Sequence, residues 1–325
     1  MKGVITFKKW FIPVFFLGLN FCVVQLTGAE GIQRGEVQKV AVIPGTGMID
    51  GPAYNPDDGM LYFVEMEAGW ISRITPDGKN LERIYNIGKM GGKIGPKSMV
   101  WDRKRKKLLI LDRDFGILAL DPKTKELITL IDTYQGGKFN GPDDLIEDSE
   151  GNIYFTDPWG TSVSNPDGAV YRVVGEGLGR KIIKLMDNLA FPDGILISPD
   201  ESFIYVGELG TNRILRAFLI DGGRDTLFPH VFIYFDTAGG PDGMAMDVKG
   251  NLYVAHWGAG KVYVVEPQKG QIIDEIEIPD PEGVFTTNVA FGGPDNKTLF
   301  ITESAKRTIW KVGVTNPGMT IPPEK

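Results

Sequence analysis

Four aspartates recur at the start of apolar segments, at nearly regular distances along the chain. Three of them follow a proline, in Gly-Pro-Asp-Asp at Asp143, Phe-Pro-Asp-Gly at Asp193 and Gly-Pro-Asp-Gly at Asp242. A serine and an asparagine stand at the same place in two other segments. The six aligned positions are Asp50, Ser98, Asp143, Asp193, Asp242 and Asn288. Carboxylate and amide oxygens are the ligands of hard cations, and a carboxylate can also serve as a general base. The pattern therefore indicates metal binding or acid–base chemistry.

The same short sequences are also good turn formers, because proline fixes φ and aspartate caps its own turn. Pro76-Asp77-Gly78 lies outside the aligned positions and predicts an ordinary turn. The aligned copies differ because apolar residues follow at once, as in Ile195-Leu196-Ile197 after Asp193. We therefore expect the aligned aspartates to begin strands.

The elements that position these residues are six copies of one hairpin unit. An apolar segment of the Leu-Tyr-Phe-Val kind recurs, each copy preceded by a turn rich in Asp, Gly, Asn or Lys and, before it, by another apolar segment. The copies are Leu61 to Val64, Leu108 to Leu111, Ile153 to Thr156, Ile204 to Gly207, Leu252 to Ala255 and Leu299 to Thr302. The period of about 48 residues fits four short strands with their turns. Since one such sheet cannot bury both faces alone, the sequence predicts an all-β, six-bladed β-propeller with four-stranded antiparallel blades.

A second set of polar residues falls directly after these apolar copies. Its members are Glu65, Asp112, Asp157, Glu208, His256 and Glu303. Acidic residues at such strand ends are expected to accept hydrogen bonds from the neighbouring turns and to hold blade to blade. For His256 we consider two roles, blade packing and orientation of a substrate.

The inner strands of a propeller converge, so we expect the four aspartates to meet. Uncompensated carboxylates in one buried space would cost several kcal/mol per ion, which a cation offsets. Oxygen ligands from separate strands suit Ca²⁺, with its six to eight flexible ligands, better than octahedral Mg²⁺. Zinc is disfavoured, because only His230 and His256 occur and the sole cysteine, Cys22, lies in the N-terminal segment.

Four segments together resemble the six-bladed gluconolactonase, senescence-marker-protein (regucalcin-like) and diisopropyl-fluorophosphatase family, which includes drug-responsive lactonases. They are residues 138–145, 191–195, 239–253 and 287–293. The resemblance covers nearly all of residues 40–312 and implies one catalytic divalent metal held by Asp50, Asp143, Asp193 and Asp242. The family more often has Glu at the first of these positions and Asn at the second and third. The extra charge implies altered metal affinity or substrate preference.

The working hypothesis is metal-dependent hydrolysis of a lactone or related small ester. Asp242 is the expected base and Asp193 the second choice, because a carboxylate that ligates a metal through one oxygen can accept a proton through the other. Asn140, Asn288 and His256 are candidates for binding the substrate. The competing hypothesis is an exported, non-catalytic propeller with a structural metal that binds a protein or carbohydrate.

The N-terminal residues predict export. Lys2, Lys8 and Lys9 precede an apolar run, and Thr27-Gly28-Ala29 offers small residues for cleavage. We expect a signal peptide at 1–29, the propeller at 30–315 and a loose C-terminal tail at 316–325, in a periplasmic or secreted protein.

Loss of the three lysines of the signal peptide changes the net charge from −7 to −10. This acidity argues against nucleic acid as a partner, and no membrane association is expected after cleavage.

Overall fold

The computed structural model describes residues 32, 34–175, 179–280 and 282–320. The predicted signal peptide lies outside the described residues, and the following account concerns the unit formed by residues 31–325. No helix in the described part of the chain is long and apolar enough to cross a membrane.

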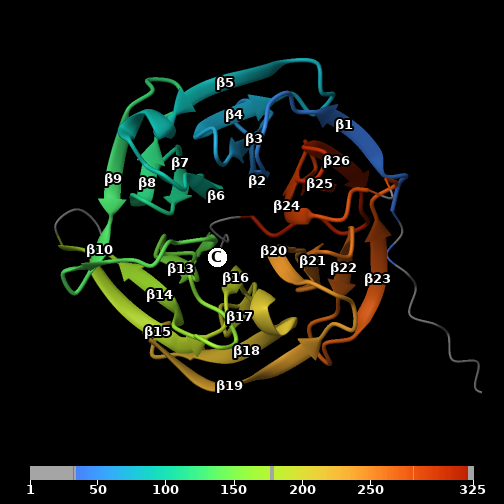
Figure 1. Ribbon diagram of the computed structural model, residues 1–325. Coiled ribbons are helices and arrows are strands. Elements are labelled where there is room, and N and C mark those ends of the chain that lie inside the picture. Colours follow the sequence, from blue (N-terminus) through green and yellow to red (C-terminus); the bar gives the residue numbers. More distant parts are fainter. Residues whose placement is uncertain (1–31, 33, 176–178, 281, 321–325) are drawn as a thin grey trace, which may run out of the picture. The chain divides into compact units, whose positions relative to one another are not determined.

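The strands form six four-stranded antiparallel sheets around a central channel, which confirms the predicted six-bladed propeller (Figure 1). From the channel outward, the first blade consists of β2(Ile49–Asn55), β3(Met60–Glu65), β4(Trp70–Ile74) and β5(Leu81–Asn86). The second consists of β6(Pro96–Asp102), β7(Lys107–Asp112), β8(Gly116–Leu120) and β9(Leu127–Ile131). The third consists of β12(Leu145–Glu147), β13(Ile153–Asp157), β14(Gly168–Val174) and β15(Lys181–Leu189). The next two are β16(Pro192–Ile197), β17(Phe203–Glu208), β18(Arg213–Ile220), β19(Asp225–Tyr234); and β20(Gly240–Met246), β21(Leu252–Trp257), β22(Lys261–Val265), β23(Ile272–Glu277). The sixth is β24(Thr286–Gly292), β25(Thr298–Glu303), β26(Thr308–Gly313) and β1(Gln38–Val42).

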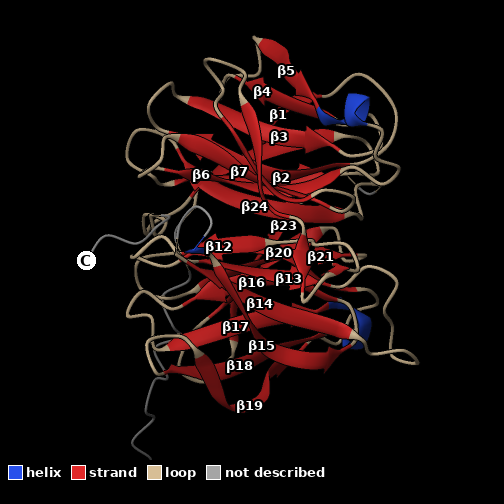
Figure 2. Ribbon diagram, turned by 90° about the vertical axis from the view of Figure 1, so that its left-hand side faces the viewer, coloured by secondary structure: helices blue, strands red, loops and turns tan. Residues whose placement is uncertain are grey.

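Short elements complete the connections. Two 3₁₀ turns, η1(Ile87–Met90) and η3(Leu209–Thr211), follow β5 and β17, and the two-stranded hairpin β10(Thr133–Tyr134) with β11(Gly137–Lys138) precedes the third blade. Seen from the side, the strands lie between two faces made of loops and turns (Figure 2).

The six predicted apolar segments are the second strands of the blades. Neighbouring blades cover both faces of these strands, so their side chains are buried in succession rather than alternately. The second residue of each segment is large, and four of the six are fully buried tyrosines. These are Tyr62, Tyr154, Tyr205 and Tyr253. The repeated aromatic position places one bulky side chain in each of these blades and explains why the pattern was visible in the sequence.

The propeller closes by pairing the two ends of the chain. Strand β1 pairs antiparallel with β26, so the sixth blade contains residues from both ends. The buried carboxylate of Glu65 in the first blade accepts a hydrogen bond from Arg307 of the sixth blade at 2.7 Å. Thr287 Oγ1 also donates to the carbonyl of Ile49 at 3.1 Å. These contacts tie the first blade to the last.

The acids at the ends of the second strands hold turns, as expected. Asp157 accepts from the backbone N–H groups of Asn140 and Gly141 at 3.0 and 2.7 Å. Glu303 likewise accepts from Ala305 N–H at 2.7 Å and from Phe285 N–H at 3.2 Å. This set therefore organises the connections between blades.

The inner strands are irregular at one level of the channel. The pairing between first and second strands shifts register between Asp50 and Ala53, Pro96 and Ser98, Pro192 and Ile195, Pro241 and Met244, and Thr286 and Asn288. A β-bulge turns a side chain away from the direction that regular alternation would give it. The bulges thus decide which side chains enter the channel.

The C-terminal segment is not loose at residues 316–319, and the sequence prediction is wrong there. Asn316 Nδ2 donates to the buried Asp247 at 2.9 Å, and Met319 N–H donates to the carbonyl of Met246 at 2.8 Å. The carbonyl of Gly318 accepts from Asn296 Nδ2 at 2.6 Å. These bonds attach the segment to the fifth and sixth blades. Residues 321–325 are outside the described part of the chain.

Candidate functional site

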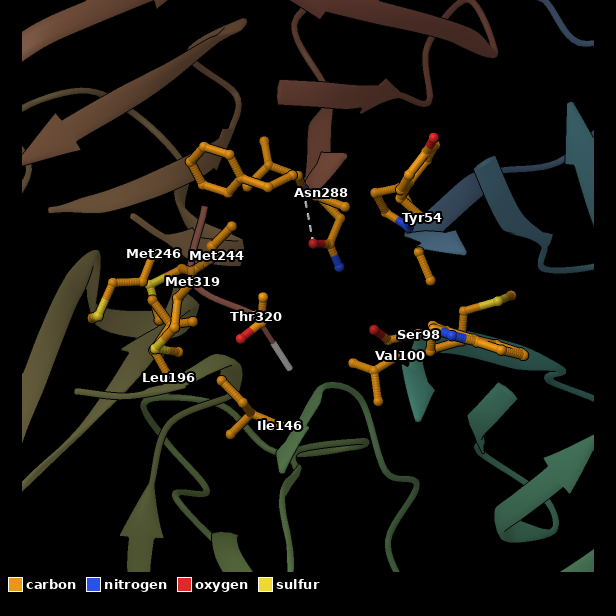
Figure 3. Close-up of a pocket in the computed structure, with 18 of the residues that line it drawn as sticks. Tyr54, Ser98, Val100, Ile146, Leu196, Met244, Met246, Asn288, Met319 and Thr320 are labelled. Carbon is orange, nitrogen blue, oxygen red and sulfur yellow. Dashed lines mark hydrogen bonds between the residues drawn. The ribbon is translucent and has the colours of Figure 1, made fainter. Parts of the chain in front are cut away.

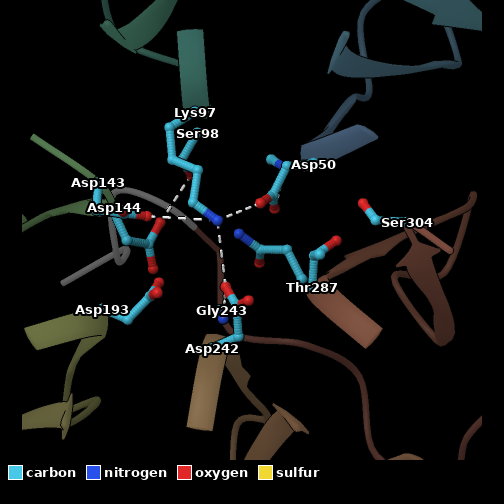
Figure 4. Close-up of polar contacts among 12 residues, drawn as sticks. Asp50, Lys97, Ser98, Asp143, Asp144, Asp193, Asp242, Gly243, Thr287 and Ser304 are labelled. Atoms are coloured by element: carbon cyan, nitrogen blue, oxygen red, sulfur yellow. Dashed lines mark hydrogen bonds and ion pairs between the residues drawn. The ribbon is translucent and has the colours of Figure 1, made fainter. Parts of the chain in front are cut away.

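The fold brings the four predicted aspartates together at the level of the bulges (Figure 4). Asp50, Asp193 and Asp242 lie in the inner strands β2, β16 and β20, and Asp143 lies just before β12. All four are at most 2% exposed. We call Asp50, Asp143, Asp193 and Asp242 the aspartate ring.

A lysine that the sequence analysis did not select reaches into the aspartate ring. Lys97 Nζ is ion-paired with Asp50 Oδ2 and lies 3.4 Å from Asp242 Oδ1 and 3.5 Å from Asp143 Oδ1. Burial disfavours its charge, but the nearby aspartates outweigh this effect and raise the pKa of Lys97 well above its usual value. Lys97 is therefore an ammonium ion, 6% exposed, in contact with three of the four carboxylates.

The position of Lys97 corrects the sequence alignment in the second blade. Pro96 pairs with Asp112 just as Pro192 pairs with Glu208 and Pro241 with His256. The next residue in each inner strand is Lys97, Asp193 or Asp242. Lys97, not Ser98, is thus the counterpart of the aspartates.

The signal that could have identified Lys97 is the frame Gly95-Pro96-Lys97, which matches Gly240-Pro241-Asp242. The basic residue makes this match inconspicuous, because the other copies carry acidic residues. Ser98 lies one residue further along β6, where its hydroxyl donates to Asp144 Oδ1 at 2.7 Å. Ser98 and Asp144 therefore form a separate polar pair beside the aspartate ring.

A second cation, Arg113, contacts the aspartate ring from the turn after β7. Its guanidinium Nη2 donates to Asp143 Oδ2, and its Cζ lies 4.1 Å from the centroid of the Trp159 ring. Burial raises the pKa of the Asp143 carboxyl, but Arg113 and Lys97 outweigh burial and hold it below its usual value. Asp143 is therefore ionised and anchored.

The remaining carboxyls are less inclined to ionise. Burial, and then the charges of Asp143 and Asp242, raise the pKa of Asp193 well above its usual value. Burial raises the pKa of Asp242 to about 7, although the charge of Lys97 opposes this. Burial also raises the pKa of Asp50, against the effect of Lys97. Asp193 and Asp242 are thus the carboxyls of the ring best able to take up a proton.

Asn288 lies in the layer next to the aspartate ring. Its side-chain oxygen accepts from Val289 N–H at 2.8 Å, and its amide lies where a Cβ on Gly243 would stand. Ser98, Asp144 and Asn288 are among the residues that line a cavity of about 190 Å³, together with many apolar side chains. Figure 3 shows this cavity. Val100, Ile146, Leu196, Met244, Met246 and Met319 contribute to its walls. None of the four ring aspartates is among the lining residues, so the cavity is adjacent to the ring and separate from it.

The other two residues predicted to bind substrate have structural contacts. His256 is fully buried, with Nε2 2.9 Å from Asn212 Oδ1 and its ring packed against Phe235 and Tyr263. It therefore joins the fifth blade to the fourth. Asn140 donates through its side-chain amide to the carbonyl of Asp167 at 3.2 Å, in the loop that leads to Asp143. The hydrogen bonds of His256 and Asn140 given above go to Asn212 and Asp167, and neither partner belongs to the aspartate ring.

The chemistry of the aspartate ring fits a divalent cation. It offers only oxygen donors, and Asp143 Oδ1 is buried without a hydrogen-bond partner. Four ionised carboxylates with Lys97 and Arg113 would carry a net charge of −2, which a dication neutralises. Lys97 nevertheless lies among the carboxylates. Within the described ranges, no three acidic or histidine side chains are arranged around a shared metal position.

Fold and site together define a class: a six-bladed propeller with buried carboxylates gathered in its channel. Residues 49–305 match the family model described as "SMP-30/Gluconolactonase/LRE-like region". The chain belongs to this family, as its sequence motifs implied.

Individual relatives agree with this assignment. The chain is 31% identical to lactonase drp35 of Staphylococcus aureus over 228 residues, covering 68% of this chain and 67% of the relative. It is 28% identical over 286 residues to a gluconolactonase of Zymomonas mobilis, covering 78% and 76%. A calcium-binding protein, regucalcin, from Agrobacterium tumefaciens shares the fold, with a TM-score of 0.72 and 20% identity over 90% of this chain and 98% of the other. Family membership and these relatives support lactone hydrolysis by this chain.

Proposed function

We propose that the chain hydrolyses a lactone or related small ester at the aspartate ring. The observation that carries this proposal is the convergence of four buried aspartates, at the positions implied by the family motifs, in a chain whose relatives are named lactonases. The substrate class is a neutral small molecule with an ester carbonyl.

Asp242 is proposed as the general base. Burial raises the pKa of its carboxyl in the metal-free site to about 7, and a carboxylate that ligates an ion through one oxygen can accept a proton from water through the other. The proton of water passes to Asp242 while the hydroxide oxygen bonds to the carbonyl carbon. The C–O bond between the carbonyl carbon and the ester oxygen of the lactone then breaks. The departing alkoxide takes the proton from Asp242, and the product is a hydroxy acid. Asp193 is the alternative base, since burial and the charges of Asp143 and Asp242 raise its pKa well above the usual value.

Calcium remains the proposed cofactor, with Asp50, Asp143, Asp193 and Asp242 as its ligands. Support comes from the oxygen-only donor set, from the net charge of the site and from a structural neighbour named as calcium-binding. When bound, such an ion polarises an ester carbonyl. Arg113 would hold Asp143 in place through their ion pair.

The test is hydrolysis of an aldonolactone and an aromatic lactone by the purified protein, followed by acid release. Assays are run after treatment with a chelator and again after Ca²⁺ is restored. Turnover that falls with the chelator and returns with Ca²⁺ supports both parts of the proposal. Turnover unaffected by the chelator would refute calcium dependence alone. Absence of turnover with both lactones would refute the proposal of a hydrolase and favour the competing hypothesis of a non-catalytic binding protein.

Export is a further part of the proposal. It rests on the basic and apolar residues of the first 29 positions. The mass of the protein recovered from outside the cytoplasm should correspond to a chain that begins at Glu30. An intact N-terminus would contradict cleavage.

A further inference from the structure

We propose that the ammonium of Lys97 and a divalent cation compete for the same place in the aspartate ring. Lys97 then acts as a tethered counter-ion that holds the ring together without metal and lowers its metal affinity. The inference rests on the proposed function only in taking the aspartate ring as the cation site. It concerns metal binding and requires no turnover.

Lys97 Nζ contacts carboxylate oxygens from three blades: it pairs with Asp50 and lies 3.4 and 3.5 Å from Asp242 and Asp143. These are three of the four side chains that would ligate a metal, and Ca²⁺ binds carboxylate oxygens at about 2.3 to 2.6 Å. An ion bound to the same three carboxylates would stand next to the ammonium. The two cations would repel strongly in a buried site.

Lys97 stands at a repeated position of the propeller. Its backbone occupies the slot that holds Asp193 and Asp242 in the other blades, and the bulge between Pro96 and Ser98 turns its side chain inward. The lysine is therefore part of the repeated architecture of the site. Its flexible four-carbon stem allows the ammonium to leave while the strand stays in place.

Lys97 contacts three of the four carboxylates of the aspartate ring. Arg113 forms an ion pair with the carboxylate of Asp143 as well. Without Lys97, four carboxylates would face Arg113 alone, and the site would attract a dication more strongly. Asp143 Oδ1 is buried and makes no hydrogen bond, and Lys97 Nζ lies 3.5 Å from it, so departure of the ammonium would leave this oxygen to such an ion.

The experiment is calorimetric titration of metal-free protein with CaCl₂ at fixed ionic strength. Lys97→Met keeps the length of the stem and removes the charge. Lys97→Gln is a second neutral variant whose amide can donate hydrogen bonds to the carboxylates and so protects folding. Lys79→Met is the matched control, because it removes one positive charge from a side chain that is 78% exposed.

We expect both Lys97 variants to bind Ca²⁺ about 100-fold more tightly than the wild-type protein, and Lys79→Met to bind like wild type. Added Ca²⁺ should raise the melting temperatures of the two Lys97 variants more than that of the wild-type protein. Equal affinity in all four proteins, or no binding by either Lys97 variant, would overturn the competition. Lactone turnover is measured separately, so a failed hydrolase proposal would leave this result interpretable.

Discussion

His256→Gln should remove a pH-dependent part of the stability of the propeller. Nε2 of His256 lies 2.9 Å from Asn212 Oδ1 and so carries the proton of the neutral ring, while Nδ1 is buried without a hydrogen-bond partner. A second proton would have to go onto the buried Nδ1, where the charge of the imidazolium would be cut off from water. Burial accordingly lowers the pKa of His256 from 6.5 to about 4.

The magnitude follows from proton linkage. The pKa of His256 is lower in the folded state than in the unfolded state. Below pH 6.5 the unfolded chain therefore binds the proton more readily, and the stability of the fold decreases as the pH is lowered. The decrease develops between pH 6.5 and pH 4. At pH 5 the loss is about 2 kcal/mol relative to pH 8, and below pH 4 it approaches about 3.4 kcal/mol at 1.36 kcal/mol per pKa unit.

The assay is urea unfolding of wild type and His256→Gln at pH 8, 7, 6 and 5. The variant loses some packing against Phe235 and Tyr263 at every pH, but its decrease between pH 8 and pH 5 should be about 2 kcal/mol smaller than that of wild type. His230→Gln, which replaces the other, exposed histidine, is the matched control. An identical pH dependence in wild type and His256→Gln would refute the reasoning.

Two further substitutions probe the site itself. Arg113→Met removes the partner of buried Asp143 and should lower the free energy of unfolding by about 3 to 5 kcal/mol in urea titrations; a loss below about 1 kcal/mol would show that the pair does not hold the ring. Gly243→Ala places a Cβ within 2.0 to 2.3 Å of the Asn288 side-chain amide and should cost about 1 to 2 kcal/mol. This cost should shrink when Asn288→Ala is present, and a double-mutant cycle without coupling would contradict the contact.

Most of the fold was predictable because each blade repeats the same local pattern. An apolar second strand follows a polar turn in all six units, and tyrosines or other large residues recur at one position, as at Tyr62 and Tyr253. Such local regularity survives in the sequence. The pairing of β1 with β26 joins residues about 270 positions apart and leaves no comparable local signal.

The candidate site was predictable only in part. Three of the four aspartates share a Pro-Asp frame, Asp50 stands at the matching place of the first blade, and the structure brings all four together. Lys97 was missed because a bulge shifts the register by one residue, and a bulge depends on the pairing of two strands. Arg113 was missed because it comes from a turn between other strands. Its role exists only through its contact with Asp143.

The central claim is that the aspartate ring carries out hydrolysis, and Asp242→Asn tests it most directly. Asparagine keeps the shape of the side chain but cannot act as the base, so kcat on the best lactone should fall by about 10² to 10⁴. The thermal transition should stay near that of wild type, because burial already disfavours the ionised carboxyl at this position and a neutral amide replaces it without a change of shape. An Asp242→Asn protein that folds normally and keeps the wild-type kcat would contradict the account.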